Sequence, residues 1–265
     1  ITEISATGGI NWRPAIAAVG GKHAMVAWER KVNGHFEILA RRFSKDGLEP
    51  IQIVTRAGDR DCCRPAIAVD SQERYIIAWD QFDGPGGPNV YLTTTENGEP
   101  GRPVQVTHHP AANICPALAV DAKDRVWIAW HSNRRGNDKW DIPRWFYLRC
   151  WADGEFYDPI SEPKDKNLDK EGTDQSFEFV RLATAKDGRV IVTGRPSHNF
   201  CLQHYHGGTW SPMYRLPMES WGGRGQFMNA AFDDAGDLWI VRREWGANVL
   251  QRITGLDQEQ AEPKL

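Results

Sequence analysis

Three segments of this chain repeat one pattern without a gap. Each begins with Arg-Pro or Cys-Pro, continues as Ala, an aliphatic residue and Ala, and later reaches Ala-Trp. The spacing from Pro14 to Trp28 recurs unchanged from Pro65 to Trp79 and from Pro116 to Trp130. Self-similarity at a fixed period is the mark of a repeat architecture, in which each copy is one supersecondary unit.

Two weaker copies follow, one from Leu182 to Thr193 and one from Ala230 to Val241. The five copies begin near residues 14, 65, 116, 180 and 228. The longer step between the third and fourth copies reflects an insertion at about residues 161–174, rich in Lys, Asp, Glu and Pro. Because the copies run along the whole chain, we expect a single domain over residues 1–265.

Each copy reads as four short β-strands separated by polar or Gly-containing turns, such as Asp70–Arg74 and Lys45–Gly47. No segment carries the apolar stripe of a long amphipathic helix. A repeated four-stranded antiparallel unit of roughly 50 residues is typical of a β-propeller. The sequence therefore predicts an all-β fold, a five-bladed β-propeller of four-stranded antiparallel blades.

The two ends of the chain predict how the ring closes. Ile1–Ser5 resembles Val104–Thr107, which reads as the outermost strand of a blade, and the last copy stops after a third strand near 249–253. We expect the N-terminal strand to complete the last blade, because closure removes exposed sheet edges.

Composition and charge exclude several classes of protein. The formal net charge is −3, from 32 Lys and Arg against 35 Asp and Glu, which argues against a nucleic-acid partner because phosphate binding needs a basic excess. Apolar runs such as Tyr75–Trp79 are far too short to span a membrane. The chain starts at Ile1 without a signal-peptide pattern, which favours a processed mature protein or a domain of a longer one.

The five cysteines leave at least one thiol unpaired within the chain. Cys63 and Cys115 occupy nearly the same place in successive copies, so a disulfide between blades and buried free thiols would both fit. No cysteine spacing matches a zinc site. His204 and His206 point to the same side of a strand but lack a third ligand at a suitable spacing. We expect no cofactor and no metal site.

The candidate functional face is the one with the long loops. In a propeller, the loop that joins strands two and three lies on the same face as the loop between blades, and here these loops are long and varied. Function is often carried on such loops, so we place the candidate site at this mouth of the central channel. The polar and aromatic residues that register to it are Trp12, Arg13, Glu29, Arg64, Asp80, His131, Arg134, Arg195, His198, Trp221, Arg224 and Glu244.

Two side-chain types on this face point to a ligand. Arg binds carboxylate, sulfate or phosphate through parallel hydrogen bonds, and Trp faces stack on sugar rings or hold cations. The leading prediction is a carbohydrate or small anionic ligand, bound by all of these residues except Glu29. The plainer alternative is that the Arg and carboxylate side chains pair between adjacent blades. Trp28 and its counterparts at 79, 130 and 239 belong to the repeat itself, and we expect them to pack between blades.

The sequence leaves open whether the chain is an enzyme. Carboxylates from Glu29, Asp80 and Glu244 would serve glycoside hydrolysis, which needs an acid and a base or nucleophile at a fixed separation. His131 or His198 as a general base would serve a polysaccharide lyase, with an arginine neutralising the substrate uronate. A third possibility is a protein-interaction propeller whose contact is the insertion at about 161–174.

The repeat also resembles a known group of proteins. Pro-Ala-Ile-Ala-Val-Asp at 65–70, followed by Ile-Ala-Trp at 77–79, is similar to bacterial secreted or periplasmic β-propellers of the sialidase-like and TolB-like kind. The Asp-box of true sialidases, Ser-x-Asp-x-Gly-x-Thr-Trp, is absent. Trp221–Gln226 and the two Arg-Pro-Ala-Ile-Ala copies resemble propeller modules that precede metal-dependent hydrolase domains in large bacterial proteins. The resemblance implies a secreted or periplasmic accessory module, with other domains of a parent protein as partners.

Overall fold

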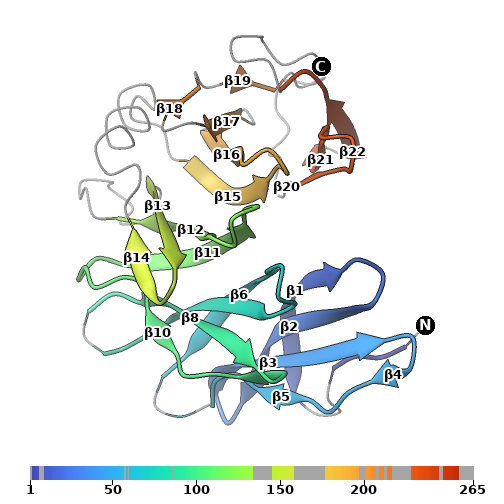
Figure 1. Ribbon diagram of the computed structural model, residues 1–265. Helices are drawn as coiled ribbons and strands as arrows, with labels where there is room; N and C mark the ends of the chain where they lie inside the picture. Colours follow the sequence, from blue (N-terminus) through green and yellow to red (C-terminus); the bar gives the residue numbers. More distant parts are fainter. Residues whose placement is uncertain are drawn as a thin grey trace. The chain divides into compact units, whose positions relative to one another are not determined.

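The fold is built from β-strands. The computed structural model describes residues 2–5, 9–56, 58, 60–84, 86–133, 145–157, 177–196, 201–206, 209–211, 214–216, 228–244 and 247–256. Within these residues there are strands and turns and no helix. The strands form five successive antiparallel sheets (Figure 1). The chain is an all-β protein, a five-bladed β-propeller, as the repeat predicts.

The chain divides into two compact units. The first holds Ile1–Leu118 and Trp130–Pro143, and the second holds Ala119–Ala129 and Arg144–Leu265. In the described part of the chain, no helix is long and apolar enough to cross a membrane. The insertion at 161–174 lies outside the described residues.

The first two sheets belong to the first unit. One orders β1 (Ile10–Val19), β2 (His23–Val32) and β3 (His35–Ser44), with the short strands β4 (Gly47–Leu48) and β5 (Gln52–Ile53) both along β3. The other orders β6 (Cys62–Val69), β7 (Tyr75–Gln81) and β8 (Asn89–Glu96), with β9 (Glu99–Pro100) and β10 (Val104–Gln105) both along β8. The predicted fourth strand is thus two short strands. Pro50 and Pro103 lie in the gaps, where a residue without an N–H cannot donate to the ladder.

The remaining sheets complete the repeat. The third comprises β11 (Asn113–Val120), β12 (Val126–Ser132), β13 (Trp145–Ala152) and β14 (Glu155–Tyr157). The fourth comprises β15 (Phe177–Thr184), β16 (Val190–Pro196) and β17 (Cys201–His206), with β18 (Thr209–Trp210) and β19 (Tyr214–Arg215) along β17. In the described residues, the fifth has three strands, β20 (Met228–Phe232), β21 (Leu238–Glu244) and β22 (Ala247–Ile253).

The N-terminal segment lies against the first sheet. Residues 2–5 form no strand. Ile4 packs against Trp28 and Leu39, and its carbonyl accepts a hydrogen bond of 3.1 Å from Nη1 of Arg41. Since residues 2–5 form no strand, the N-terminal strand expected to complete the last blade is not among the described strands.

The core of the first unit lies between its two sheets. The first sheet contributes Met25 and Ile38, and the second contributes Ile77 and Trp79. Trp79 is fully buried and stacks on Tyr91 with ring centroids 6.2 Å apart. Trp79 therefore packs between these two blades, as expected, whereas Trp28 packs within the first sheet. In the second unit, a separate core joins the fourth and fifth sheets through Ile191, Leu202, Leu238, Ile240 and Ile253.

A repeated aspartate fixes the tight turn between the first two strands of a blade. Oδ1 of Asp121 accepts the backbone N–H groups of Lys123 and Arg125 at 2.9 and 3.1 Å, and Oδ2 accepts Nε1–H of Trp127 at 2.9 Å. Asp70 makes the corresponding backbone contacts in the second blade. Such local side-chain bonds are what favour Asp in turns, so this end of each blade is set by sequence close at hand.

Candidate functional site

A cavity of about 600 Å³ opens in the first unit, at the end of the strands where the long loops lie. It gathers three of the predicted ligand-binding residues, Trp12, Arg13 and Arg64. Its full lining is Trp12, Arg13, Phe36, Asp61, Cys63, Arg64 and Phe82. We call this cavity the Trp12 pocket. Its volume lies within the range of about 300–1,000 Å³ that is usual for small-molecule sites.

Matching irregularities in two first strands place the arginines. The pairing of β1 with β2 shifts register between Trp12 and Ala15, and that of β6 with β7 shifts between Cys63 and Ala66. Arg13 and Arg64 lie inside these shifts with φ angles of 46° and 54°, in the left-handed region that non-glycine residues rarely adopt. A β-bulge of this kind re-aims a side chain. Here each bulge directs an arginine to the buried carboxylate at the end of the neighbouring second strand.

Glu29 holds Arg13. Nη1 of Arg13 donates to Oε1 and Oε2 of Glu29 at 3.1 and 3.0 Å, and the backbone N–H of Arg64 also donates to Oε1. The Glu29 side chain is fully buried, whereas that of Arg13 is 57% exposed. In the described part of the chain, Nη1 is the only atom of the Arg13 guanidinium with a protein partner, so Nε and Nη2 remain available to a ligand.

Asp80 holds Arg64 in the same way, one blade further on. Nε and Nη2 of Arg64 donate to Oδ2 and Oδ1 at 2.7 and 2.5 Å, and the backbone N–H of Cys115 donates to Oδ2 at 2.9 Å. Each carboxylate thus binds the arginine of its own blade and the bulge N–H of the next. The plainer alternative predicted that Arg and carboxylate side chains pair between adjacent blades. The structure differs in one respect: each Arg–carboxylate pair lies within one blade, and a backbone N–H group makes the hydrogen bond between blades.

Burial controls the ionisation of the groups beneath the pocket. It raises the pKa of Asp80 to about 6, even though the Arg64 guanidinium acts in the opposite direction. Burial alone would lower the pKa of Arg64, but the charge and hydrogen bonds of Asp80 raise it, so the guanidinium stays charged. Burial also raises the pKa of the Cys63 thiol to about 12. Since thiolate is the reactive form, Cys63 lines the pocket as an unreactive thiol.

Aromatic rings form the walls of the Trp12 pocket. Trp12 is 44% exposed and Phe82 is 42% exposed, large values for such side chains. The rings of Trp12 and Phe36 lie with centroids 5.4 Å apart and an interplanar angle of 33°. Oδ1 of Asp61 accepts the backbone N–H of Phe36 at 2.8 Å and so fixes this wall. An exposed aromatic surface beside guanidinium groups suits the face of a sugar ring.

Three lining residues, Phe36, Asp61 and Phe82, were not predicted from the sequence. Phe82 directly follows β7 in a long loop, so its position on the candidate face could have been inferred from the same register that selected Asp80. Phe36 is the second residue of the third strand of its blade, and Asp61 precedes a first strand. Neither belongs to the repeated pattern, so no signal in one sequence marks them.

For the other predicted residues, the structure gives the position in a strand but few side-chain contacts. His131 lies near the end of β12, at the position that corresponds to Glu29 and Asp80, and is 6% exposed. Arg195 lies in β16, where its register partner is Glu178, and Glu244 ends β21. The remaining predicted residues lie outside the described residues: Arg134, His198, Trp221 and Arg224.

The cysteines and histidines form no metal cluster in the described part of the chain. No group of three or more His, Cys, Asp or Glu side chains there could hold a metal ion. All five cysteines are free thiols, so of the two arrangements considered for Cys63 and Cys115 the structure has unpaired thiols and no disulfide.

Comparison with known proteins identifies the fold. No family model and no curated protein matches the chain. The NanB sialidase from Streptococcus pneumoniae matches with a TM-score of 0.63 at 9% identity, over 95% of this chain and 60% of the sialidase. The polysaccharide lyase Uly1 matches with a TM-score of 0.62 at 11% identity, over 92% of this chain and 58% of the lyase.

A third structure matches over nearly its whole length. The endo-arabinase from Bacteroides thetaiotaomicron VPI-5482 has a TM-score of 0.54 at 12% identity, over 95% of this chain and 96% of the arabinase. This chain therefore spans about three fifths of the sialidase and the lyase but almost all of the arabinase. At these identities the likeness shows the β-propeller fold alone.

Proposed function

We propose that this chain binds a carbohydrate that carries an acidic group, or a similar small anion, in the Trp12 pocket. The observation that carries the proposal is the pair of arginines at the bulges. Each is anchored on a buried carboxylate through part of its guanidinium, and Nε and Nη2 of Arg13 are left unpaired. Guanidinium groups held in place lose little freedom on binding, which favours a carboxylate or sulfate.

The sugar part of the ligand is argued from the walls of the pocket. Trp12 and Phe82 expose ring faces next to the arginines, and such faces stack on sugar rings. Three structures that share this fold are named as a sialidase, an endo-arabinase and a polysaccharide lyase. Their names add support for a carbohydrate, while fold alone does not establish function.

The buried carboxylates favour binding over catalysis. Both oxygens of Glu29 and of Asp80 accept hydrogen bonds from arginine or backbone N–H groups, and both side chains are fully buried. A general acid or base must come within hydrogen-bond reach of the substrate. In this proposal the two carboxylates orient arginines. The second candidate is an enzyme that acts on polysaccharide, favoured by the names of the three structures, with Glu29, Asp80, His131 or Glu244 as its acid, base or nucleophile.

The proposal also covers the location of the protein and the larger protein to which it belongs. We propose a secreted or periplasmic accessory module of a larger bacterial protein, in line with the resemblance of its repeats, with other domains of that protein as partners. The third candidate, a protein-interaction propeller, would use the insertion at 161–174.

One experiment separates these candidates. The chain is incubated with neutral, uronate-bearing and sulfated oligosaccharides, and both affinity and soluble products are measured. Binding of an acidic sugar without products, weakened about tenfold or more by Arg13→Gln and by Trp12→Ala, is the expected result. Arg102→Gln, which removes an arginine outside the pocket, is the matched control. Products from any substrate would favour the enzyme, and acidic-sugar binding that both variants leave intact would refute the site.

A further inference from the structure

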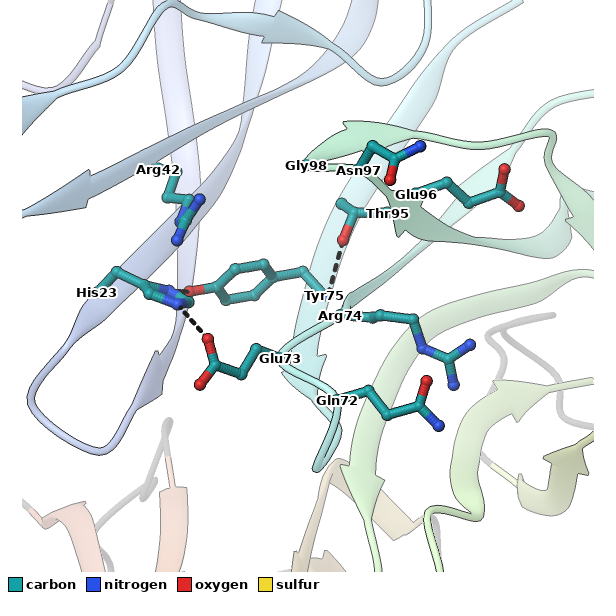
Figure 2. Close-up of a pocket in the computed structure, with 10 residues that line it drawn as sticks. All are labelled: His23, Arg42, Gln72, Glu73, Arg74, Tyr75, Thr95, Glu96, Asn97 and Gly98. Atoms are coloured by element: carbon teal, nitrogen blue, oxygen red, sulfur yellow. Dashed lines mark hydrogen bonds and ion pairs between the residues drawn. The ribbon is translucent and has the colours of Figure 1, made fainter.

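A second pocket lies at the opposite end of β2 and β7 from the Trp12 pocket. It has a volume of about 450 Å³ and lies between two turns of the second sheet and the side chains of His23 and Arg42 from the first. Figure 2 shows the β8–β9 turn, with Glu96, Asn97 and Gly98, across the pocket from the β6–β7 turn, with Gln72, Glu73 and Arg74. We call it the turn pocket. The turns at this end are short, and no candidate residue was predicted there from the sequence.

The fixed charges at the turn pocket are compensated within the chain. Glu73 accepts hydrogen bonds from Lys22 at 2.5 Å and contacts Nε2 of His23 at 3.0 Å. Nδ1 of His23 lies 2.6 Å from the hydroxyl of Tyr75, so both ring nitrogens have partners. Arg74 donates to Asp70 at 2.7 Å. These charged side chains are therefore already paired within the chain.

The side chains left with bonding capacity are mostly neutral. In the described part of the chain, the amide groups of Gln72 and Asn97 make no side-chain hydrogen bond, and Glu96 has no ion-pair partner. Nε of Arg42 is buried without an acceptor. Two amides offer donors and acceptors together. The Arg42 guanidinium is paired with Glu49 at 3.4 Å, so the Glu96 carboxylate is left uncompensated and disfavours an anionic ligand. A hydroxyl group also both donates and accepts, so a hydroxyl-rich neutral molecule matches this set.

Backbone geometry adds a second argument. Glu73 has a φ of 62°, in a left-handed turn position that holds Asp124 in the third blade and Gly236 in the fifth. A side chain other than glycine is strained there. Glu73 occupies the position with its carboxylate tied to the first sheet, which fixes one rim of the turn pocket. We propose that the turn pocket is a second binding site, for a neutral mono- or disaccharide, separate from the site in the Trp12 pocket.

The test measures binding of a panel of neutral mono- and disaccharides, galacturonate and glucosamine to the whole chain by ligand-detected NMR. The expected result is millimolar binding of a neutral sugar, weakened at least tenfold in the double variant Gln72→Ala, Asn97→Gly. Glycine suits position 97 because Asn97 has a φ of 52°. Asn33→Gly is the matched control, since Asn33 has a φ of 51° in an Asn-Gly turn outside the pocket.

Each other outcome overturns the proposal. These outcomes are no binding of any neutral sugar, binding of the charged sugars alone, and binding that the double variant leaves unchanged. Trp12→Ala separates the two pockets. If it abolishes binding of the neutral sugar, the sugar occupies the Trp12 pocket, which refutes the turn pocket and leaves the proposed function standing. If the neutral sugar still binds but acidic sugars bind nowhere, the turn pocket stands and the proposed function fails.

Discussion

Replacing Glu29 tests whether this carboxylate orients Arg13 or takes part in chemistry. In Glu29→Gln the amide oxygen can still accept the backbone N–H of Arg64, but the amide NH₂ then faces Nη1 of Arg13, and two donors repel. Because the Arg13 side chain is 57% exposed, it can turn to water. We expect a loss of about 1–2 kcal/mol in the free energy of unfolding, near the value of one hydrogen bond.

Glu29→Ala removes both carboxylate oxygens and therefore every hydrogen bond that this side chain accepts. The backbone N–H of Arg64, which now donates to Oε1, would lose its acceptor. An orphaned buried donor costs about 1–3 kcal/mol, and the loss of the charge-assisted bond to Arg13 adds about 1–2 kcal/mol. We therefore expect a total of roughly 2–5 kcal/mol, about twice the loss in the glutamine variant. The surface pair of Glu49 with Arg42, 3.4 Å apart, supplies the control: Glu49→Gln should cost less than about 1 kcal/mol.

Urea unfolding followed by tryptophan fluorescence gives these values, and the slope of the transition should stay constant across the variants. The affinity of Glu29→Gln for an acidic oligosaccharide should fall about tenfold, because Arg13 is no longer held in place. Stability and affinity equal to those of the parent chain would refute the orienting role. A variant as stable as the parent that loses product formation would show that Glu29 is catalytic.

Three further predictions follow from burial. The pKa of Asp80 is raised from 3.8 to about 6. Between these pH values the folded chain therefore binds a proton at Asp80 that the unfolded chain has lost. The free energy of unfolding, measured in urea titrations, should fall as pH rises from about 4 to about 6. Asp80→Asn should remove this slope; an unchanged slope would assign it to another group. The pKa values of Cys62 and Cys63 are raised to about 11 and about 12, so iodoacetamide at pH 8 should label these thiols only after unfolding, and rapid labelling of the folded chain would contradict their burial. Trp79→Ala should cost about 3–5 kcal/mol in urea unfolding because Trp79 is fully buried between blades, and a loss below about 1 kcal/mol would place it outside the core.

The fold could be predicted from this one sequence because each blade repeats its local signals. Prolines, turn residues and tryptophans recur at fixed spacing, and each repeat is a unit whose apolar faces need neighbours. Two details escaped the pattern. Pro50 and Pro103 divide the fourth strand, and Ile4 follows the apolar surface of the first sheet.

The candidate site was predictable only in part. Trp12, Arg13 and Arg64 flank the repeated proline, so their shared register placed them on one face. Phe36 and Asp61 join them in the same pocket without any repeated signal. Whether an arginine serves a ligand or a carboxylate depends on which of its N–H groups are already bonded, and register does not contain that information.

The sequence by itself determined the blades, their order and the face on which Arg13 and Arg64 stand, because these follow from periodicity and turn chemistry within about 50 residues. Only the tertiary structure decided the partners. The backbone N–H of Arg64 donates to Glu29, from the preceding blade, and Glu73 of the second blade accepts a hydrogen bond from Lys22 of the first. Contacts of this kind depend on how two sheets pack, and packing is settled by the shapes of many side chains together.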